Sequence, residues 1–150
     1  MKLRKSTRYA LFAATEMARL APGETVTAGE VAGRHGIPVS VMAKVFQELV
    51  RADVALGVRG PRGGYRLAAA PAKITLLAII DRFEPGAPEP GDLPRGIRRP
   101  ANGADRLQRV VQQVDALVRA AYASISLETL VEREDRVVPD VPVRKGPPGA

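Results

Sequence analysis

The stretch VRGPRGGYRL, residues 58–67, constrains the fold more than any other part of this 150-residue chain. Residues that favour β-strands flank a centre of turn-forming residues, which are Gly60, Pro61, Gly63 and Gly64. This pattern predicts a β-hairpin, a narrow ribbon that projects from the elements around it. Three arginines lie along the ribbon: Arg59, Arg62 and Arg66.

Two short helices are predicted before this hairpin. Thr27 and Glu30 form a capping box, in which each side chain accepts a hydrogen bond from the other residue's backbone N–H, so a helix is expected to begin there and to end near Gly36. A second helix is expected over residues 39–51. Its apolar residues recur at helical spacing and predict one buried face, made by Met42, Val45, Phe46, Leu49 and Val50. The opposite face carries Ser40, Val41, Ala43, Lys44, Gln47 and Arg51.

A helix, a glycine turn, a second helix and a basic ribbon, in this order, are typical of a winged helix-turn-helix. In that fold the second helix enters the major groove of DNA, and the ribbon lies against phosphates or the minor groove. The distribution of charge agrees with this interpretation. Residues 1–73 contain 12 Lys and Arg against 5 Asp and Glu, a net charge of +7, whereas residues 74–150 contain 11 of each kind. All the excess positive charge therefore lies in the half that would bind phosphates.

The predicted fold class is mainly α with a small β-hairpin wing. Residues 1–84 are expected to form the winged helix-turn-helix domain, with a first helix at about residues 6–20 and a last helix capped by Thr75. Residues 85–103 contain five Pro and four Gly, and are therefore expected to form a loop.

Residues 104–134 contain the longest amphipathic segment. An unbroken apolar stripe runs along it, made by Leu107, Val110, Val111, Val114, Leu117, Val118, Ala121 and Tyr122. A long helix reached through a loop often pairs with its twin across a two-fold axis, so we expect this to be a dimerisation helix; the alternative is that the stripe packs along its own domain. Ser126 is expected to cap a short helix after it. The tail, residues 135–150, is expected to be disordered.

The chain contains no cysteine, which excludes disulfides, thiolate catalysis and cysteine-ligated zinc or iron–sulfur sites. No stretch approaches the roughly 20 apolar residues of a membrane span, and the amino terminus does not look like a cleavable signal, so a cytoplasmic protein without membrane association is expected. The hairpin glycines lack the Lys-Ser/Thr of a phosphate-binding loop. His35, Asp81 and Glu84 are interpreted as solvated surface residues. The sequence offers no set of nucleophile, general base and orienting residue, and we expect no enzymatic activity.

Four segments resemble the bacterial Rrf family of transcriptional regulators: Arg8-Tyr9-Ala10, Gly36-Ile37-Pro38, the hairpin at 58–67, and Ser124-Ile125-Ser126-Leu127. The resemblance spans residues 1–84, and 104–134 by pattern. It implies a dimeric winged helix-turn-helix transcription factor that binds double-stranded DNA. It also implies which residues contact the DNA: Ser40, Val41 and Lys44 in the recognition helix, Arg59 and Arg62 in the wing, and Lys5, Thr7 and Arg8 near the first helix.

Two departures from the family matter. Many members carry an aromatic residue and a glutamate where this chain has Val41 and Ala43, so the DNA sequence that it recognises is expected to differ. Members that bind an iron–sulfur cluster hold it with cysteines in the segment that corresponds to 85–103, which contains none here. We therefore expect no cofactor and no metal. The effector is then a small molecule or a partner protein, unless the protein has none.

The function expected from the sequence is that of a sequence-specific DNA-binding transcriptional regulator, acting as a homodimer without an iron–sulfur cluster. Repression is the favoured mode of action, and activation is compatible with the same residues. The alternative is a protein-interaction module that docks an acidic partner through the same basic face. Arginines at the tip of a projecting ribbon favour DNA, because insertion into the minor groove uses them directly. RNA binding is less favoured, since a chain with three Phe, three Tyr and no Trp offers no evident aromatic platform for stacked bases.

Overall fold

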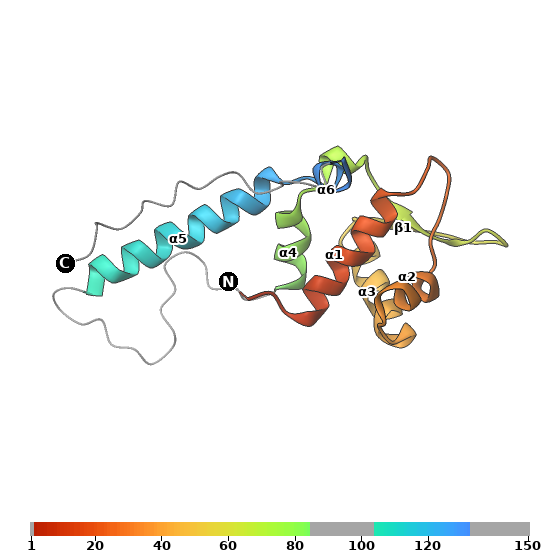
Figure 1. The fold of residues 1–150 in the computed structure, drawn as a ribbon, viewed down its shortest axis with the longest axis horizontal. Coiled ribbons are helices and arrows are strands. Elements are labelled where there is room, and N and C mark those ends of the chain that lie inside the picture. Colours follow the sequence, from red (N-terminus) through yellow and green to blue (C-terminus); the bar gives the residue numbers. More distant parts are fainter. Residues whose placement is uncertain (1, 85–103, 133–150) are drawn as a thin grey trace, which may run out of the picture.

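The computed structural model describes residues 2–84 and 104–132, so the loop predicted at 85–103 and the tail predicted at 135–150 lie outside the described residues (Figure 1). The elements are, in order, α1 (Lys5–Ala18), α2 (Ala28–His35), α3 (Val39–Arg51), β1 (Ala55–Val58), β2 (Gly64–Leu67), the 3₁₀ turn η1 (Pro71–Lys73), α4 (Leu76–Phe83), α5 (Ala104–Ser124) and α6 (Leu127–Glu132). The strands form an antiparallel hairpin. A mainly helical chain with a small β-hairpin confirms the predicted fold class.

The helices α2, α4 and α6 begin at the capping residues that the sequence indicated. The Thr27 hydroxyl accepts a hydrogen bond from the Glu30 N–H, and the Glu30 carboxylate accepts one from the Thr27 N–H, so the capping box of α2 is confirmed. Thr75 and Ser126 each accept a hydrogen bond from the backbone N–H three residues later, at the starts of α4 and α6. These caps satisfy N–H groups that a helix cannot pair internally.

The core forms around α1. Its inner face is lined by the fully buried alanines Ala10, Ala13 and Ala14, and these small side chains let α3 and α4 pack closely against it. The larger buried side chains of α3 and α4 fill the space around α1: Phe46, Met42, Leu49, Ile79 and Ile80. Val50 was predicted for the buried face of α3 but is 36% exposed, because it lies at the edge of that face in the last turn of the helix.

The short helix α6 returns to the amino-terminal core although it follows α5 in the sequence. The Leu76 N–H donates to the Ile125 carbonyl and the Leu127 N–H donates to the Ile74 carbonyl, both at 2.9 Å, and the Leu127 side chain is fully buried. The described part of the predicted 104–134 segment is therefore split. Its last helix packs with the winged-helix core, whereas α5 extends away from that core with its carboxyl end next to α4 (Figure 1).

None of the helices in the described ranges is long and apolar enough to cross a membrane. This includes α5, which has 21 residues.

Candidate nucleic-acid interface

A short turn joins α2 to α3. Gly36 ends α2 in the left-handed conformation with φ of 64°, a region that residues with a side chain rarely adopt. The next residue, Ile37, is buried, and its N–H donates to the Ala32 carbonyl at 3.0 Å. The Pro38 carbonyl then accepts the first hydrogen bonds of α3. The turn thus fixes α3 against α2 with one face of α3 toward solvent.

That outward face carries the predicted recognition residues. At about 100° per residue, the face opposite the buried side chains of α3 is centred on Ser40, Lys44, Gln47 and Arg51, and all four are exposed. Val41 lies at one edge of this face and is 37% exposed. The structure therefore places Ser40, Val41 and Lys44 together on the surface of α3.

The wing is fixed to the rest of the domain by the segment before α2. Residues 59–63 form the tip of the hairpin, beyond the paired strands. Val26 exchanges two backbone hydrogen bonds with Tyr65 of β2, at 3.0 and 2.8 Å. Near the tip, the Thr25 hydroxyl donates to the Arg62 carbonyl at 2.8 Å. These bonds hold the tip in one position relative to the helix-turn-helix.

Two glycines in the wing leave no space for a side chain. A Cβ on Gly63 would lie 2.7 Å from the Val58 carbonyl oxygen and 2.8 Å from that of Gly60. A Cβ on Gly64 would lie 2.7 Å from the Val26 carbonyl oxygen, in the bridge to the segment before α2. Close approach between backbones therefore requires glycine at both positions. The glycine spacing that predicted the hairpin has this packing as its physical cause.

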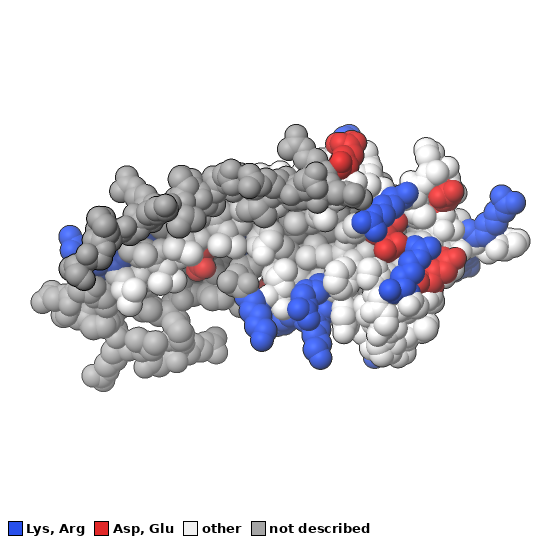
Figure 2. Space-filling view, in the orientation of Figure 1, with Lys and Arg blue, Asp and Glu red and all other residues white. Residues whose placement is uncertain are grey.

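Basic side chains that form no ion pair with a described residue gather on these elements: Lys5, Arg8, Lys44, Arg59, Arg62 and Arg66. Four other arginines, in α2 and α3 or at the two ends of α1, form ion pairs with carboxylates: Arg4, Arg19, Arg34 and Arg51. Figure 2 shows Lys and Arg side chains projecting near the start of α1 and at the tip of the wing. A hollow of about 520 Å³ beside the wing is lined by all three wing arginines. Such exposed cations can neutralise phosphates without first breaking an ion pair.

Two surface residues of the interface were not among the predicted contacts. Arg66 lies opposite Leu56 in the strand register, and both are exposed, so Arg66 is on the outward face of the wing. The alternation of side chains along a strand could have placed it there. Val39, the first residue of α3, is 56% exposed. In the sequence, the position of Val39 directly after Pro38 indicated that it begins the helix.

Thr7, predicted as a backbone contact, is not on the surface. Its side chain is fully buried, and its hydroxyl donates to a Glu84 carboxylate oxygen at 2.5 Å. The reason is helical spacing, because Thr7 lies three residues before Ala10 and seven before Ala14, on the inner face of α1. Of the three predicted contacts near the start of α1, Lys5 and Arg8 are exposed.

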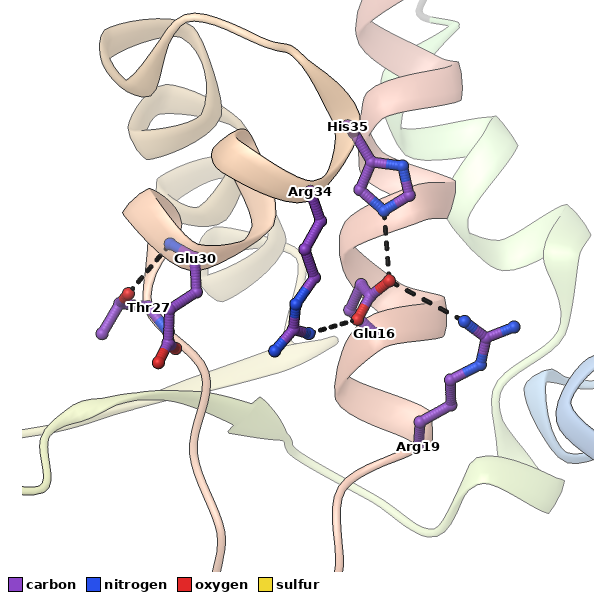
Figure 3. Close-up of polar contacts among 6 residues, drawn as sticks. All are labelled: Glu16, Arg19, Thr27, Glu30, Arg34 and His35. Atoms are coloured by element: carbon purple, nitrogen blue, oxygen red, sulfur yellow. Dashed lines mark hydrogen bonds and ion pairs between the residues drawn. The ribbon is translucent and has the colours of Figure 1, made fainter.

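His35 was interpreted as a solvated residue; it is exposed, and it also takes part in a polar cluster between α1 and α2 (Figure 3). Its Nε2 lies 3.1 Å from a Glu16 carboxylate oxygen, and its ring stacks on Phe12 with centroids 4.8 Å apart. Arg34 donates to the other Glu16 oxygen at 2.6 Å. Burial raises the pKa of Glu16, but the hydrogen bonds and charges of Arg34 and His35 together outweigh burial and leave that pKa below its ordinary value. The cluster fixes the orientation of α2 on α1.

Asp81 and Glu84 were also interpreted as solvated. Asp81 is exposed, Glu84 is half-buried, and both have partners. Asp81 forms a bidentate ion pair with Arg119 of α5, with N–O distances of 2.8 and 3.1 Å. Glu84 accepts hydrogen bonds from the Thr7 hydroxyl and from the Arg4 N–H, the latter at 2.7 Å, and these bonds lower the pKa of its carboxyl group. The Arg4 side chain provides no cap for α1, so Glu84 supplies a negative charge at the start of that helix.

Comparison with known proteins assigns the chain to one family. The model of the Rrf2 family, described as "Iron-dependent Transcriptional regulator", matches residues 3–133. The chain belongs to the Rrf2 family. A putative HTH-type transcriptional regulator, BadM of Rhodopseudomonas palustris, is 36% identical over 133 residues, which are 88% of this chain and 82% of BadM. The HTH-type transcriptional regulator IscR of Aliivibrio salmonicida is 36% identical over 84 residues, 56% of this chain and 50% of that protein.

Solved structures agree on the fold. CymR of B. subtilis superposes with a TM-score of 0.74 at 23% identity, covering 90% of this chain and 99% of CymR. IscR of T. potens superposes with a TM-score of 0.68 at 22% identity, covering 87% of this chain and 86% of that chain. As an Rrf2 protein with this winged helix-turn-helix, the chain is a DNA-binding transcriptional regulator and not an enzyme.

The family's description names iron, but the side chains of this Rrf2 protein do not fit a thiolate-ligated iron–sulfur cluster. The chain has no cysteine to supply thiolates, and its single histidine is engaged by Glu16 and Phe12. Within the described ranges, no group of three or more His, Cys, Asp or Glu side chains comes together as a metal site. We therefore assign a thiolate-ligated cluster no role in the action of this protein.

Proposed function

We propose that this Rrf2 protein is a homodimeric repressor that binds paired half-sites in double-stranded DNA without an iron–sulfur cluster. In each subunit, Ser40, Val41 and Lys44 contact base edges in the major groove. Arg59 and Arg62 reach the adjacent minor groove or its phosphates, and Lys5 and Arg8 contact phosphates from the start of α1. The observation that carries this assignment is the set of exposed cations on α1, α3 and the wing that form no ion pair with a described residue.

The apolar stripe of α5 supports the dimer. Five of its residues are between 50% and 71% exposed: Leu107, Val110, Val111, Val114 and Leu117. The other predicted stripe residues, Val118, Ala121 and Tyr122, are partly buried near the end of α5 that lies beside α4. A helix that extends from the core with such a stripe exposed leaves apolar surface in water, and a second copy related by two-fold symmetry buries it on both subunits.

We propose repression because a dimer that occupies a site across a promoter can block polymerase by occupancy alone. Because the target is chromosomal DNA, we place the protein in the cytoplasm. A small molecule or a partner protein is the proposed class of effector. Protein purified without oxygen is expected to be colourless, because an iron–sulfur cluster would absorb visible light.

The test is selection of bound sequences from random duplex DNA, combined with light scattering on the free protein. We expect a palindromic site whose half-sites are centred about one helical turn, or a multiple of it, apart, and a mass of two chains. A monomeric mass with a single asymmetric site would overturn the two-fold model. In a reporter assay, expression from a promoter that carries the selected site should rise when the protein is absent.

A matched pair of variants separates the dimer from general effects of added charge. Val114→Asp places a carboxylate within the apolar stripe, where its desolvation is costly, and should give a monomer with weaker DNA binding and unchanged helix content. Ala116→Asp places the same charge on the exposed face of α5 opposite the stripe, and should remain dimeric. If both variants behave alike, α5 is not the interface.

A further inference from the structure

The amino-terminal end of α3 presents apolar side chains to solvent beside its polar recognition residues. Val39 and Val41 are 56% and 37% exposed, and they lie at opposite edges of the outward face, with Ser40 between them. Lys44 follows one turn later on the same face. Each valine is β-branched, so its methyl groups occupy an almost fixed position on the helix.

The polar chemistry available here is limited. In the first two turns of α3, the outward face offers the Ser40 hydroxyl and the Lys44 ammonium group, and the first turn contains no acidic residue. Lys44 can hydrogen-bond with guanine, but asparagine, glutamine and arginine, the other side chains that form bidentate hydrogen bonds with adenine or guanine, do not occur in α3 before Gln47. Hydrogen bonding to bases from this end of the helix therefore rests on Ser40 and Lys44, and the exposed valines are the other surface that could recognise bases.

The major groove contains one apolar determinant, the 5-methyl group of thymine. We infer that Val39 and Val41 contact thymine methyl groups and thereby select thymine at defined positions of each half-site. This inference rests on the proposed entry of α3 into the major groove. The charge favours DNA over an apolar protein partner as the occupant, because Lys44 on the same face of α3, and Lys5 and Arg8 of α1, are exposed and form no ion pair with any described residue.

The experiment removes the methyl group without changing any hydrogen-bonding group. In the DNA site obtained by selection, each thymine is replaced in turn by deoxyuridine, and affinity is measured for the full-length protein. Burial of one methyl group predicts about a fourfold loss at a contacted thymine, and about a fifteenfold loss when both half-sites carry the replacement. The double variant Val39→Ala/Val41→Ala should bind the two DNAs equally, and the single variants assign each methyl group to one valine.

Two controls make the result specific. Val50→Ala trims an exposed valine at the other end of α3, and this variant should keep the full sensitivity to deoxyuridine. At a sensitive position, 5-methylcytosine should bind better than cytosine with the unmodified protein, because it restores the methyl group alone. The double variant should bind these two DNAs equally.

The outcomes separate the inference from the proposed function. Failure to select any duplex DNA overturns both. A selected site whose affinity is unaffected by every deoxyuridine replacement overturns the inference and leaves the DNA-binding mode in place. Methyl sensitivity that persists in the double variant also overturns it, because another residue then contacts the thymine.

Discussion

The ring of Tyr65 in the wing stacks on the ring of Phe46 in the recognition helix, with centroids 4.5 Å apart and planes inclined by 19°. Phe46 is fully buried, and Tyr65 is partly buried at the base of the hairpin. The two elements proposed to enter adjacent grooves are thus in direct contact through their inner faces. Their spacing is set by core packing and not by the exposed residues that would touch DNA.

The first prediction concerns the energy of this stacked pair. Phe46→Leu, Tyr65→Leu and the double variant should show a coupling of about 0.5–1.5 kcal/mol in the free energy of unfolding, since stacked aromatic pairs contribute that much beyond buried area. The measurement is denaturant unfolding of the four proteins. Strictly additive effects would mean that the stacking does not link wing and helix energetically.

Glycine substitution in the wing should behave differently from glycine substitution in α2. Gly64→Ala places a Cβ 2.7 Å from the Val26 carbonyl oxygen, at a φ of +155°, so it should lower the unfolding free energy by more than about 1 kcal/mol and weaken DNA binding. Gly33→Ala is the matched control, because nothing lies within 4 Å of its Cβ position. In the helix it should stabilise by about 0.5–1 kcal/mol. Thermal and denaturant unfolding would show whether the two changes have opposite signs.

Local chemistry made much of the fold predictable. The capping box of Thr27 and Glu30 located the start of α2, and the turn at Gly36 and Pro38 located its end and the start of α3. The wing followed from the turn-forming residues within the hairpin, among them Gly63, whose close contacts are with residues 58 and 60 of the same hairpin. Each of these signals acts over a few residues, which is why a sequence pattern can carry it.

Long-range partners were not predictable in the same way. The hydrogen bond between Thr7 and Glu84 joins residues 77 positions apart, and the contact between Glu16 and His35 joins two different helices. Both carboxylates are charged residues on amphipathic helices, so periodicity alone favours solvent for them. Only the packing of α1 against α2 and α4 brings His35 within reach of Glu16, and Thr7 within reach of Glu84. For Thr7, the helical register with Ala10 is a local signal of burial, whereas its assignment as a DNA contact rested on the family resemblance alone.

Acid should destabilise the protein through Glu16 and Glu84. The pKa of each is lowered in the folded state from an ordinary value near 4.5, so the unfolded chain binds more protons as the pH falls. Their stabilising contribution is complete above the ordinary value and is lost as the pH falls through the lowered folded values. The free energy of unfolding should therefore be steady above about pH 5.5 and decline below it. Glu84→Gln and Glu16→Gln should each make this decline shallower, and an unchanged acid limb would show that these carboxylates are not the cause.

Removing a cation from the wing should change DNA binding in a different way from removing one from the recognition helix. Arg62→Ala takes one proposed phosphate or minor-groove contact from each subunit. Its affinity for the selected site should fall, and the slope of log affinity against log salt should decrease in magnitude by about 1.8 for the dimer, with the preferred sequence kept. Lys73→Ala removes an exposed cation from η1, which packs beside α6, and it should change neither quantity.

Lys44→Ala should alter which bases are preferred, because Lys44 projects from the outward face of α3. The discrimination should weaken by about 1–3 kcal/mol for each base that Lys44 recognises. Salt titrations and sequence-preference profiles on the three variants distinguish positioning from base recognition. The contrast depends on the wing being rigidly held by Thr25 and Val26 while its arginines stay exposed. An Arg62→Ala protein with the affinity and salt slope of the unmodified one would falsify the wing as a DNA-binding element, whatever the recognition helix does.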